Sequence, residues 1–231
     1  MKNYLITGAS RGLGAALTRH LTEQSHRVLA VARNEKALMK LKSETGADYW
    51  VLDLVELQKK DRCNSFETML HEWGPLDGLV NNAGFLGKSL FEEADDDLMR
   101  NIFEVNYHAP SRLIKLLIPH FRNDVEAHII NIGSMGGFQG SAKFPGLAHY
   151  SASKAALASL TECLAEEYKS SNLRFNCLAL GSVQTEMLAE AFPGYQASNK
   201  PEEMAAFVAD FLLNGHRIFN GKVLPLSGLS V

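Results

Sequence analysis

The stretch Thr7-Gly8-Ala9-Ser10-Arg11-Gly12-Leu13-Gly14 joins the first apolar run of the chain, residues 4–7, to a helical pattern at 13–24. Glycine lacks a Cβ, so it permits a tight turn and a close approach of the backbone to a ligand. The helix start offers free N–H groups and a partial positive charge to an anion. Glycine-rich loops are common, but this one lies between the first strand and the first helix, which predicts a dinucleotide-binding turn. We expect these residues to contact the dinucleotide: Gly8, Ser10, Arg11, Gly12, Leu13 and Gly14.

The rest of the chain alternates short apolar runs with longer amphipathic stretches. Further strands are expected at 27–32, 48–52, 78–81, 128–132, 174–179 and 223–226. Further helices are expected at 35–44, 56–72, 95–120, 150–170 and 202–213. This alternation predicts one α/β domain with a doubly wound parallel sheet of seven strands and helices on both faces. Such sheets bind ligands beyond the carboxyl ends of their strands.

Composition narrows the function classes. The 231 residues are 46% hydrophobic and 21% charged, with a formal net charge of -3. This balance gives no basic excess for nucleic acid or an anionic membrane. The first apolar run is too short for a signal peptide or a membrane span. Cys63, Cys163 and Cys177 are odd in number and widely spaced, so we expect reduced, mostly buried thiols and no metal site. The sequence therefore predicts a soluble, cytoplasmic, single-domain protein over 1–231.

The end of the second predicted strand bears on the choice of dinucleotide. An acidic residue about 20 positions after the glycines would bind the ribose 2′-hydroxyl of NAD. Here Arg33 occupies that region, and Arg11 lies within the glycine turn. Guanidinium groups suit a 2′-phosphate, so NADP(H) is favoured. The alternatives are that both arginines are ordinary surface residues, or that Glu35 reaches the ribose and NAD(H) is used.

Tyr150 and Lys154 lie four residues apart at the start of a predicted helix, hence on one face. A free tyrosine has a pKa near 10 and is a poor acid–base group at neutral pH, whereas a nearby cation lowers that pKa. A Tyr-x-x-x-Lys pair alone carries little information. Its place after the strand that ends before Ser134 adds weight, because a serine hydroxyl there could orient a substrate oxygen. Otherwise Ser134 is simply a turn residue.

The chain resembles the short-chain dehydrogenase/reductase family in motifs that occur in order along nearly its whole length. The motifs are Thr-Gly-x-x-x-Gly-x-Gly at 7–14, Asp53-Leu54, Asn81-Asn82-Ala83-Gly84, Asn106, Ser134 and Tyr150-x-x-x-Lys154. The resemblance implies a single-domain Rossmann fold, a nicotinamide cofactor and transfer of hydride between that cofactor and a carbonyl or alcohol substrate.

The resemblance also implies catalytic roles. Tyr150 would be the general acid in reduction and the general base in oxidation. Lys154 would bind the nicotinamide ribose and lower the pKa of Tyr150. Ser134 would orient the carbonyl, and Asn106 would hold a water in a proton relay with Lys154.

Further cofactor contacts follow from the same resemblance. Asp53 and Leu54 would flank the adenine, and Asn81, Ala83 and Gly84 would line the cofactor cleft. The segment Leu180-Gly181-Ser182-Val183-Gln184-Thr185 is similar to the Pro-Gly-x-x-x-Thr motif of the family. It would bring Gly181, Val183 and Thr185 to the carboxamide.

Two departures stand out. Leu180 replaces the proline of that motif, and the stretch between Ser134 and Tyr150 is a few residues longer than the family norm. The resemblance further suggests a homodimer or homotetramer packed through helices 95–120 and 150–170.

Pro110 lies inside the long helical pattern at 95–120, four residues after Asn106. Proline cannot donate to the carbonyl of residue 106, so we expect the helix to break or kink there. The freed Asn106 carbonyl would then hold the relay water. Alternatively, Pro110 simply begins a second helix.

Two segments contain the apolar residues expected of a small-molecule pocket, although both could be ordinary surface loops. They are 138–147, with Phe138, Phe144, Pro145 and Leu147, and 186–200, with Met187, Leu188, Phe192 and Tyr195. We expect a carbonyl reductase or alcohol dehydrogenase, with 3-oxoacyl reduction as one variant. The alternatives are an epimerase or dehydratase on the same fold, and a non-enzymatic NADP(H)-binding redox sensor.

Overall fold

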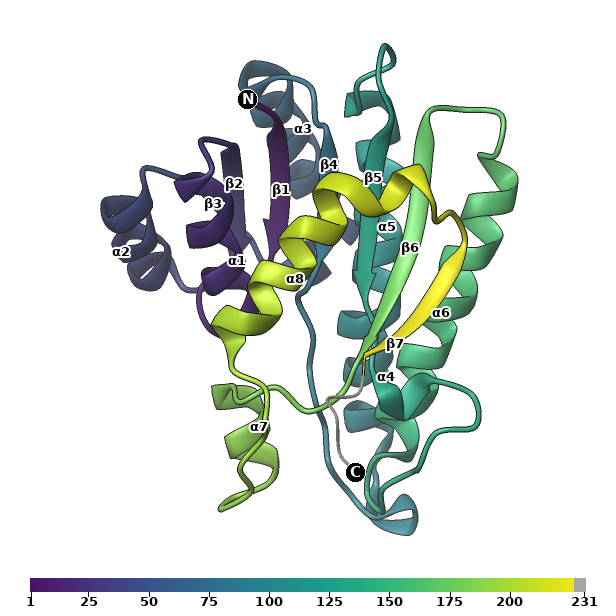
Figure 1. Ribbon diagram of the computed structural model, residues 1–231. Coiled ribbons are helices and arrows are strands. Elements are labelled where there is room, and N and C mark those ends of the chain that lie inside the picture. The colour runs from purple at the N-terminus through teal and green to yellow at the C-terminus, as the bar shows by residue number, and fades with distance from the viewer. Residues whose placement is uncertain (227–231) are drawn as a thin grey trace.

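The computed structural model describes residues 1–226, which form a seven-stranded, wholly parallel sheet (Figure 1). The strand order is β3-β2-β1-β4-β5-β6-β7. The first three strands are added towards one edge of the sheet, and β4 to β7 are added towards the other edge, starting beside β1. The strands are β1 (Asn3–Thr7), β2 (Arg27–Ala32), β3 (Asp48–Val51), β4 (Gly78–Asn81), β5 (Ala127–Ile132), β6 (Leu173–Leu180) and β7 (Lys222–Leu226). The predicted fold class is confirmed. The part of the predicted domain at 227–231 lies outside the described residues.

Helices cover both faces of the sheet. They are α1 (Gly12–Glu23), α2 (Glu35–Thr45), α3 (Lys60–Trp73), α4 (Asp96–Phe103), α5 (Ala109–Leu117), α6 (Ala148–Glu167), α7 (Glu186–Ala191) and α8 (Pro201–Asn214). One core lies beneath α1, α2 and α8, and the other lies beneath α3, α5 and α6. None of the helices described within 1–226 is long and apolar enough to cross a membrane.

The central strands alternate between the two cores. In β1, Tyr4 and Ile6 belong to the core beneath α1 and α8, whereas Leu5 belongs to the opposite core. All three side chains are at most 1% exposed. A strand buried on both faces needs apolar residues at every position, which explains why the sequence shows a continuous apolar run there.

The α-helix is interrupted before Pro110, as predicted, but by a π-helical turn, and Pro110 lies at the start of a second helix, as in the alternative. The segment Glu104–His108 is a π-helical turn, and the N–H of Ala109 bonds to the carbonyl of Glu104. Phe103, Glu104 and Ala109 keep right-handed helical dihedrals, so α4 leads into α5 without leaving the helical path. Pro110 then lies in the first turn of α5, where a missing N–H is tolerated. The wider turn accommodates the proline.

Other boundaries also differ from the predictions. The helix expected at 56–72 is a 3₁₀ turn, Leu54–Gln58, followed by α3. The loop expected at 186–200 contains the short helix α7, capped by Thr185, whose hydroxyl accepts the N–H of Leu188 at 3.3 Å. The cysteines are free, as expected, but they are not mostly buried: Cys177 is buried, Cys63 is half-buried and Cys163 is exposed.

Candidate active site

The glycine turn lies at the carboxyl end of β1 and packs against the segment after β4. Gly8 has φ +65, and a Cβ added to it would lie 2.9 Å from the Cα of Ala83. A Cβ on Gly14 would lie 2.4 Å from the carbonyl oxygen of Gly8. Both glycines are therefore required by close backbone packing within the chain itself.

Asn82, which received no role in the sequence analysis, joins β4 to this turn. Its side-chain amide donates to the carbonyls of Thr7 at 3.0 Å and Gly8 at 3.3 Å. The Thr7 hydroxyl in turn accepts the N–H groups of Asn82 and Ala83, each at 3.0 Å. Asn82 is the first residue beyond β4 and lies within the motif Asn81-Asn82-Ala83-Gly84, which are the signals in the sequence that could have identified it.

The N-terminus of α1 suits an anion. Arg11 occupies the N-cap position without a capping side-chain bond, and the first turn of α1 contains no acidic residue. The helix therefore begins with no carboxylate of its own at its positive end. Ser10 is half-buried and Leu13 is buried, so the turn is anchored on one side and open on the other. This arrangement fits the pyrophosphate of a dinucleotide.

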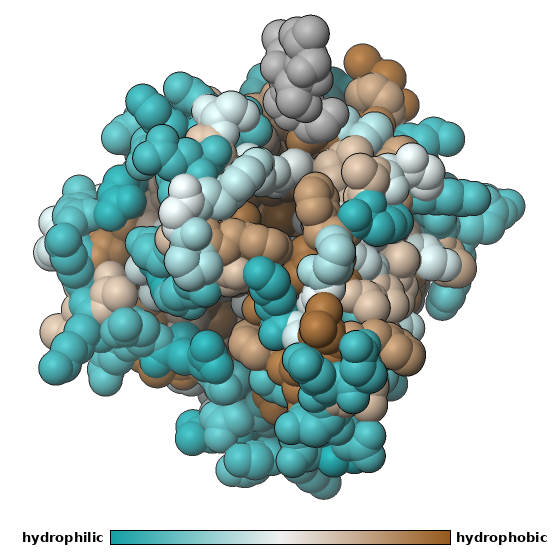
Figure 2. Space-filling model, turned by 90° about the horizontal axis from the view of Figure 1, so that it is seen from below, coloured by the Kyte–Doolittle hydropathy of each residue, from teal (hydrophilic) through white to brown (hydrophobic). Residues whose placement is uncertain are grey.

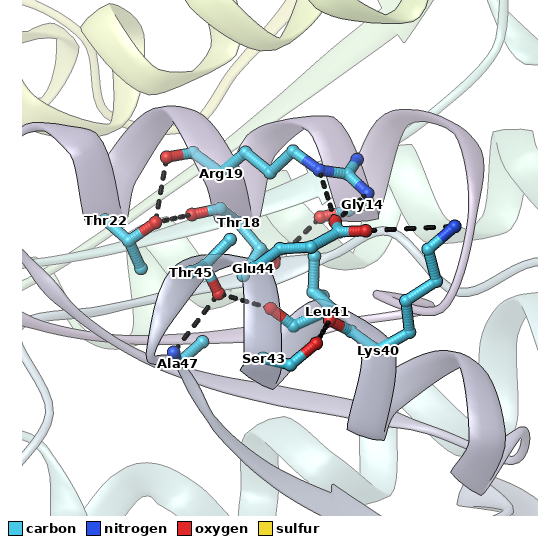
Figure 3. Close-up of polar contacts among 10 residues, drawn as sticks. All are labelled: Gly14, Thr18, Arg19, Thr22, Lys40, Leu41, Ser43, Glu44, Thr45 and Ala47. Carbon is cyan, nitrogen blue, oxygen red and sulfur yellow. Dashed lines mark hydrogen bonds and ion pairs between the residues drawn. The ribbon is translucent and has the colours of Figure 1, made fainter.

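Contacts between α1 and α2 hold the helix behind the turn (Figure 3). The Thr18 hydroxyl donates to the carbonyl of Gly14 at 2.9 Å. Glu44 of α2 accepts two bonds from Arg19 of α1, at 2.8 and 3.1 Å, and lies 3.8 Å from Lys40. Two cations near the turn are thus already paired within the α1–α2 contact.

The two arginines predicted to select NADP(H) are both exposed, and each lies beside a carboxylate. Arg11 Nη1 donates to Glu190 Oε1 of α7 at 2.7 Å. Arg33 Nη1 lies 3.7 Å from Asp53 Oδ2. Asp53 also accepts the N–H of Val55, so it caps the 3₁₀ turn that follows β3.

Two predicted cofactor contacts have buried side chains. The amide of Asn81 donates to Asn131 Oδ1 at 2.8 Å, and Asn81 is 3% exposed, so this side chain joins β4 to β5. Leu54 is 8% exposed and packs in the core beneath α3. Asn82 and Ala83, the two residues after β4, contact the turn through their backbone N–H groups.

The expected catalytic groups Tyr150, Lys154 and Ser134 come together at the carboxyl end of β5. Tyr150 lies in the first turn of α6, which begins at Ala148 and not at 150. Burial raises the pKa of Tyr150, and a hydrogen bond with Ser134 opposes that rise. The lowering of this pKa by Lys154 stays a prediction.

Lys154 is only 4% exposed, and its ammonium donates to the carbonyl of Ile132 at 2.8 Å. Burial lowers the pKa of Lys154 to about 8, and the nearby Cys177 opposes this. Burial also raises the pKa of Cys177 to about 12, so Cys177 remains a thiol. A Cβ on Gly84 would lie 3.5 Å from Lys154 Nζ, which places Gly84 directly beside the ammonium.

Asn106 joins three parts of the site from within the π-helical turn. Its side chain accepts the N–H of Phe85 at 2.8 Å and donates to the carbonyl of Phe85 at 2.9 Å. It also donates to Ser153 Oγ at 3.0 Å, and Ser153 donates to the carbonyl of Tyr150 at 2.7 Å. Ser153 lies inside the Tyr-x-x-x-Lys motif and was missed. Asn106 and Ser153 therefore fix the segment after β4 to the first turn of α6.

The extra residues between Ser134 and Tyr150 form a loop closed by Lys143. Its ammonium donates to the carbonyl of Gly136 at 2.8 Å, the carbonyl of Phe138 at 2.6 Å and Ser141 Oγ at 2.8 Å. The added length therefore does not separate Ser134 from Tyr150.

The predicted pocket walls are only partly buried. Leu147 is buried, whereas Phe144 and Tyr195 are 58% and 51% exposed. Lys88 connects the segment after β4 to α7, because its ammonium lies 3.4 Å from the carbonyl of Ala191 and 4.3 Å from the centre of the Phe192 ring. Figure 2 looks onto this edge of the sheet and shows a hollow with hydrophobic residues inside a largely hydrophilic rim.

The segment after β6 faces the glycine turn. A Cβ on Gly12 would lie 3.2 Å from Thr185 Cγ2, so Thr185 lies directly over the turn. The N–H of Gly181 bonds to the carbonyl of Leu226 at 2.8 Å. Val183 is buried and pairs with Asn199. Leu180, at the end of β6, is therefore held by strand pairing where the family has a proline.

The protein has a Rossmann fold with a glycine turn and a Tyr–Lys pair at one edge of the sheet. A family model described as short chain dehydrogenase matches residues 2–196. The 3-oxoacyl-[acyl-carrier-protein] reductase of Salmonella typhimurium is 33% identical over 183 residues, which are 79% of this chain and 74% of that relative. This chain belongs to the short-chain dehydrogenase family.

Solved structures agree with this assignment. A short chain dehydrogenase from Escherichia coli CFT073, complexed with NADPH, has a TM-score of 0.87 and 27% identity, covering 97% of this chain and 95% of that one. A 3-ketoacyl-(acyl-carrier-protein) reductase from Brucella melitensis, complexed with NADH, has a TM-score of 0.87 and 25% identity, covering 99% and 97%. No cluster of three or more potential metal ligands occurs among residues 1–226.

Proposed function

We propose that this chain is an NADP(H)-dependent oxidoreductase that interconverts a carbonyl compound and its alcohol, with Tyr150 as the proton-transferring residue. The observation that carries the proposal is the convergence of Ser134, Tyr150 and Lys154 beside Gly84, at the same sheet edge as the glycine turn. Bound NADP(H) supplies the hydride chemistry. The chain supplies binding, orientation and a proton.

Each catalytic residue has a role that its contacts support. Tyr150 gives its phenolic proton to the developing alkoxide in reduction and accepts it in oxidation. Ser134, hydrogen-bonded to Tyr150, orients the substrate oxygen. Lys154, charged at neutral pH because its pKa is about 8, stabilises the phenolate form. Asn106 positions α6, and the relay water on its carbonyl remains a prediction.

The cofactor residues divide by part of the dinucleotide. Gly12 and the start of α1 would bind the pyrophosphate, and Arg11 and Arg33 would bind the 2′-phosphate. Asp53 would bind the adenosine, and Gly181, Val183 and Thr185 would bind the carboxamide. The similar structures include a complex with NADPH and a complex with NADH, so these two do not decide between the dinucleotides. The choice of NADP(H) is supported by the arginines of this chain.

The wider assignment is also a proposal. We infer a cytoplasmic homodimer or homotetramer that packs through α4–α5 and α6. The substrate is a small carbonyl compound, and 3-oxoacyl compounds belong in the first panel because a 3-oxoacyl reductase is among the relatives.

The experiment is a fluorescence titration of NADPH and NADH, followed by turnover of the preferred cofactor across ketones, aldehydes and 3-oxoacyl compounds. We expect tighter binding of NADPH and formation of an alcohol in proportion to NADPH consumed. Tight binding without turnover on any panel member would favour the sensor. Conversion of a substrate without net consumption of NADPH would favour the epimerase or dehydratase. Preferential binding of NADH would refute the cofactor assignment.

A further inference from the structure

Helix α7 packs against the glycine turn, and an ion pair joins the two segments. Arg11, at the start of α1, and Glu190, near the end of α7, are 179 positions apart in the sequence and 2.7 Å apart in space. Thr185, which caps α7, lies over Gly12 of the same turn. The segment after β6 therefore contacts the turn at both ends of α7. Glu190 forms the ion pair with Arg11, and the Glu186 carboxylate also raises the pKa of Arg11.

Glu190 bonds to the Arg11 guanidinium, which the proposed function assigns to the 2′-phosphate of NADP(H). The hydrogen bond from Arg11 lowers the pKa of Glu190, and the same bond raises the pKa of Arg11. Glu190 is therefore a carboxylate at neutral pH. Glu190 accepts one of the five N–H donors of Arg11, so a phosphate bound to the other donors would lie close to the Glu190 carboxylate, and the two anions would repel each other.

The neighbouring cations do not share this position. A cavity of about 590 Å³ between α1, α2 and α7 is lined in part by Arg11, Arg19 and Lys40. Arg19 and Lys40 are paired with Glu44, within the contact between α1 and α2 (Figure 3). Arg11 is the member of this group whose carboxylate partner comes from the segment after β6.

We propose that Glu190 competes with the adenosine 2′-phosphate for Arg11 and thereby sets the strength of the chain's preference for NADP(H) over NAD(H). This inference rests on the proposed function. A 2′-phosphate bound to Arg11 would be repelled by the Glu190 carboxylate or would displace it, whereas NAD(H) has no 2′-phosphate and does not meet this repulsion. Glu190 is thus a specificity-determining residue outside the motifs of the family.

The exposure of the pair sets the size of the effect. The side chains of Arg11 and Glu190 are 47% and 65% exposed, so solvent screens the pair and a stronger anion can displace it. Exposed ion pairs of this kind correspond to about a two- to fivefold change in an equilibrium constant. Glu190→Gln should therefore lower the Kd for NADPH by about two- to fivefold and leave the Kd for NADH unchanged.

The test is a double-mutant cycle read by direct binding, without turnover. NADPH and NADH are titrated into the wild type, Glu190→Gln, Arg11→Gln and the double variant. Glu202→Gln serves as the matched control, because Glu202 lines the same cavity and forms no ion pair within the described residues. We expect tighter NADPH binding in Glu190→Gln only when Arg11 is present, and a smaller change in Glu202→Gln.

Three results would overturn the inference. They are an unchanged Kd for NADPH in Glu190→Gln, equal tightening of both cofactors, and equal tightening of NADPH in the absence of Arg11. Each of these leaves the proposed function standing, provided that the wild type binds NADPH. A wild type that binds neither dinucleotide would instead overturn the proposed function and the inference together.

Discussion

Lys154→Met should stabilise the fold at neutral pH while removing a group that we propose to be catalytic. The ammonium is 4% exposed, and burial lowers its pKa from the usual 10.5 to about 8. Each tenfold change in proton affinity is worth about 1.4 kcal/mol, so keeping this lysine charged costs the folded state about 3 kcal/mol. The lost bond to the carbonyl of Ile132 removes about 1 kcal/mol. The net gain expected for Lys154→Met at pH 7 is therefore about 2 kcal/mol.

The difference in stability between the wild type and Lys154→Met should depend on pH. Between pH 8 and 10.5 the unfolded chain binds the proton of Lys154 more tightly than the folded chain, so the stability of the wild type rises with pH in this window. Urea unfolding of the wild type and Lys154→Met should show the variant more stable at pH 7 and the difference shrinking or reversing by pH 10. A difference that stays constant across this window would refute the reasoning, because it would mean that the folded and unfolded pKa values are equal.

Three further outcomes follow from particular contacts. Gly14→Ala should lower the free energy of unfolding by about 3 kcal/mol, because the added Cβ would lie 2.4 Å from the carbonyl oxygen of Gly8; wild-type stability in a urea titration would contradict this. Asp95→Ala should lower the free energy of unfolding by about 1 kcal/mol in the same assay, because α4 loses its cap. Asp96→Ala should lower it less, because the Asp96 carboxylate makes only a long, exposed contact of 3.9 Å with Arg100. Burial lowers the pKa of His128 to about 3, so the fold should lose stability as pH falls from 6.5 towards 3, and His128→Gln should show a shallower loss in thermal unfolding from pH 7 to pH 4.

The positions of the main strands and of the glycine turn could be predicted from the sequence because they depend on local patterns. Apolar runs such as the one around Leu5 are long enough to be recognised without alternation, since both faces are covered. The cap of α4 depends on an equally local contact, because the Asp95 carboxylate accepts the N–H of Leu98, three residues away.

The remaining differences arise from contacts between distant segments. The π-helical turn before Pro110 depends on the fit of α4 and α5, whereas the local rule for proline predicts a break. Asn82 and Asn81 are adjacent in sequence, yet one bonds to the turn and the other to Asn131, and only the register of the sheet distinguishes them. The pair of Arg11 with Glu190 joins opposite ends of the chain, so no local pattern could indicate it.

We propose that Tyr150 transfers the proton to the substrate. The decisive measurement compares kcat/KM for reduction of the best carbonyl substrate in wild type and Tyr150→Phe, with the Kd for NADPH measured on both proteins. We expect kcat/KM to fall by about 10²- to 10⁴-fold in Tyr150→Phe while NADPH still binds. Turnover by Tyr150→Phe within a few-fold of the wild type would contradict it.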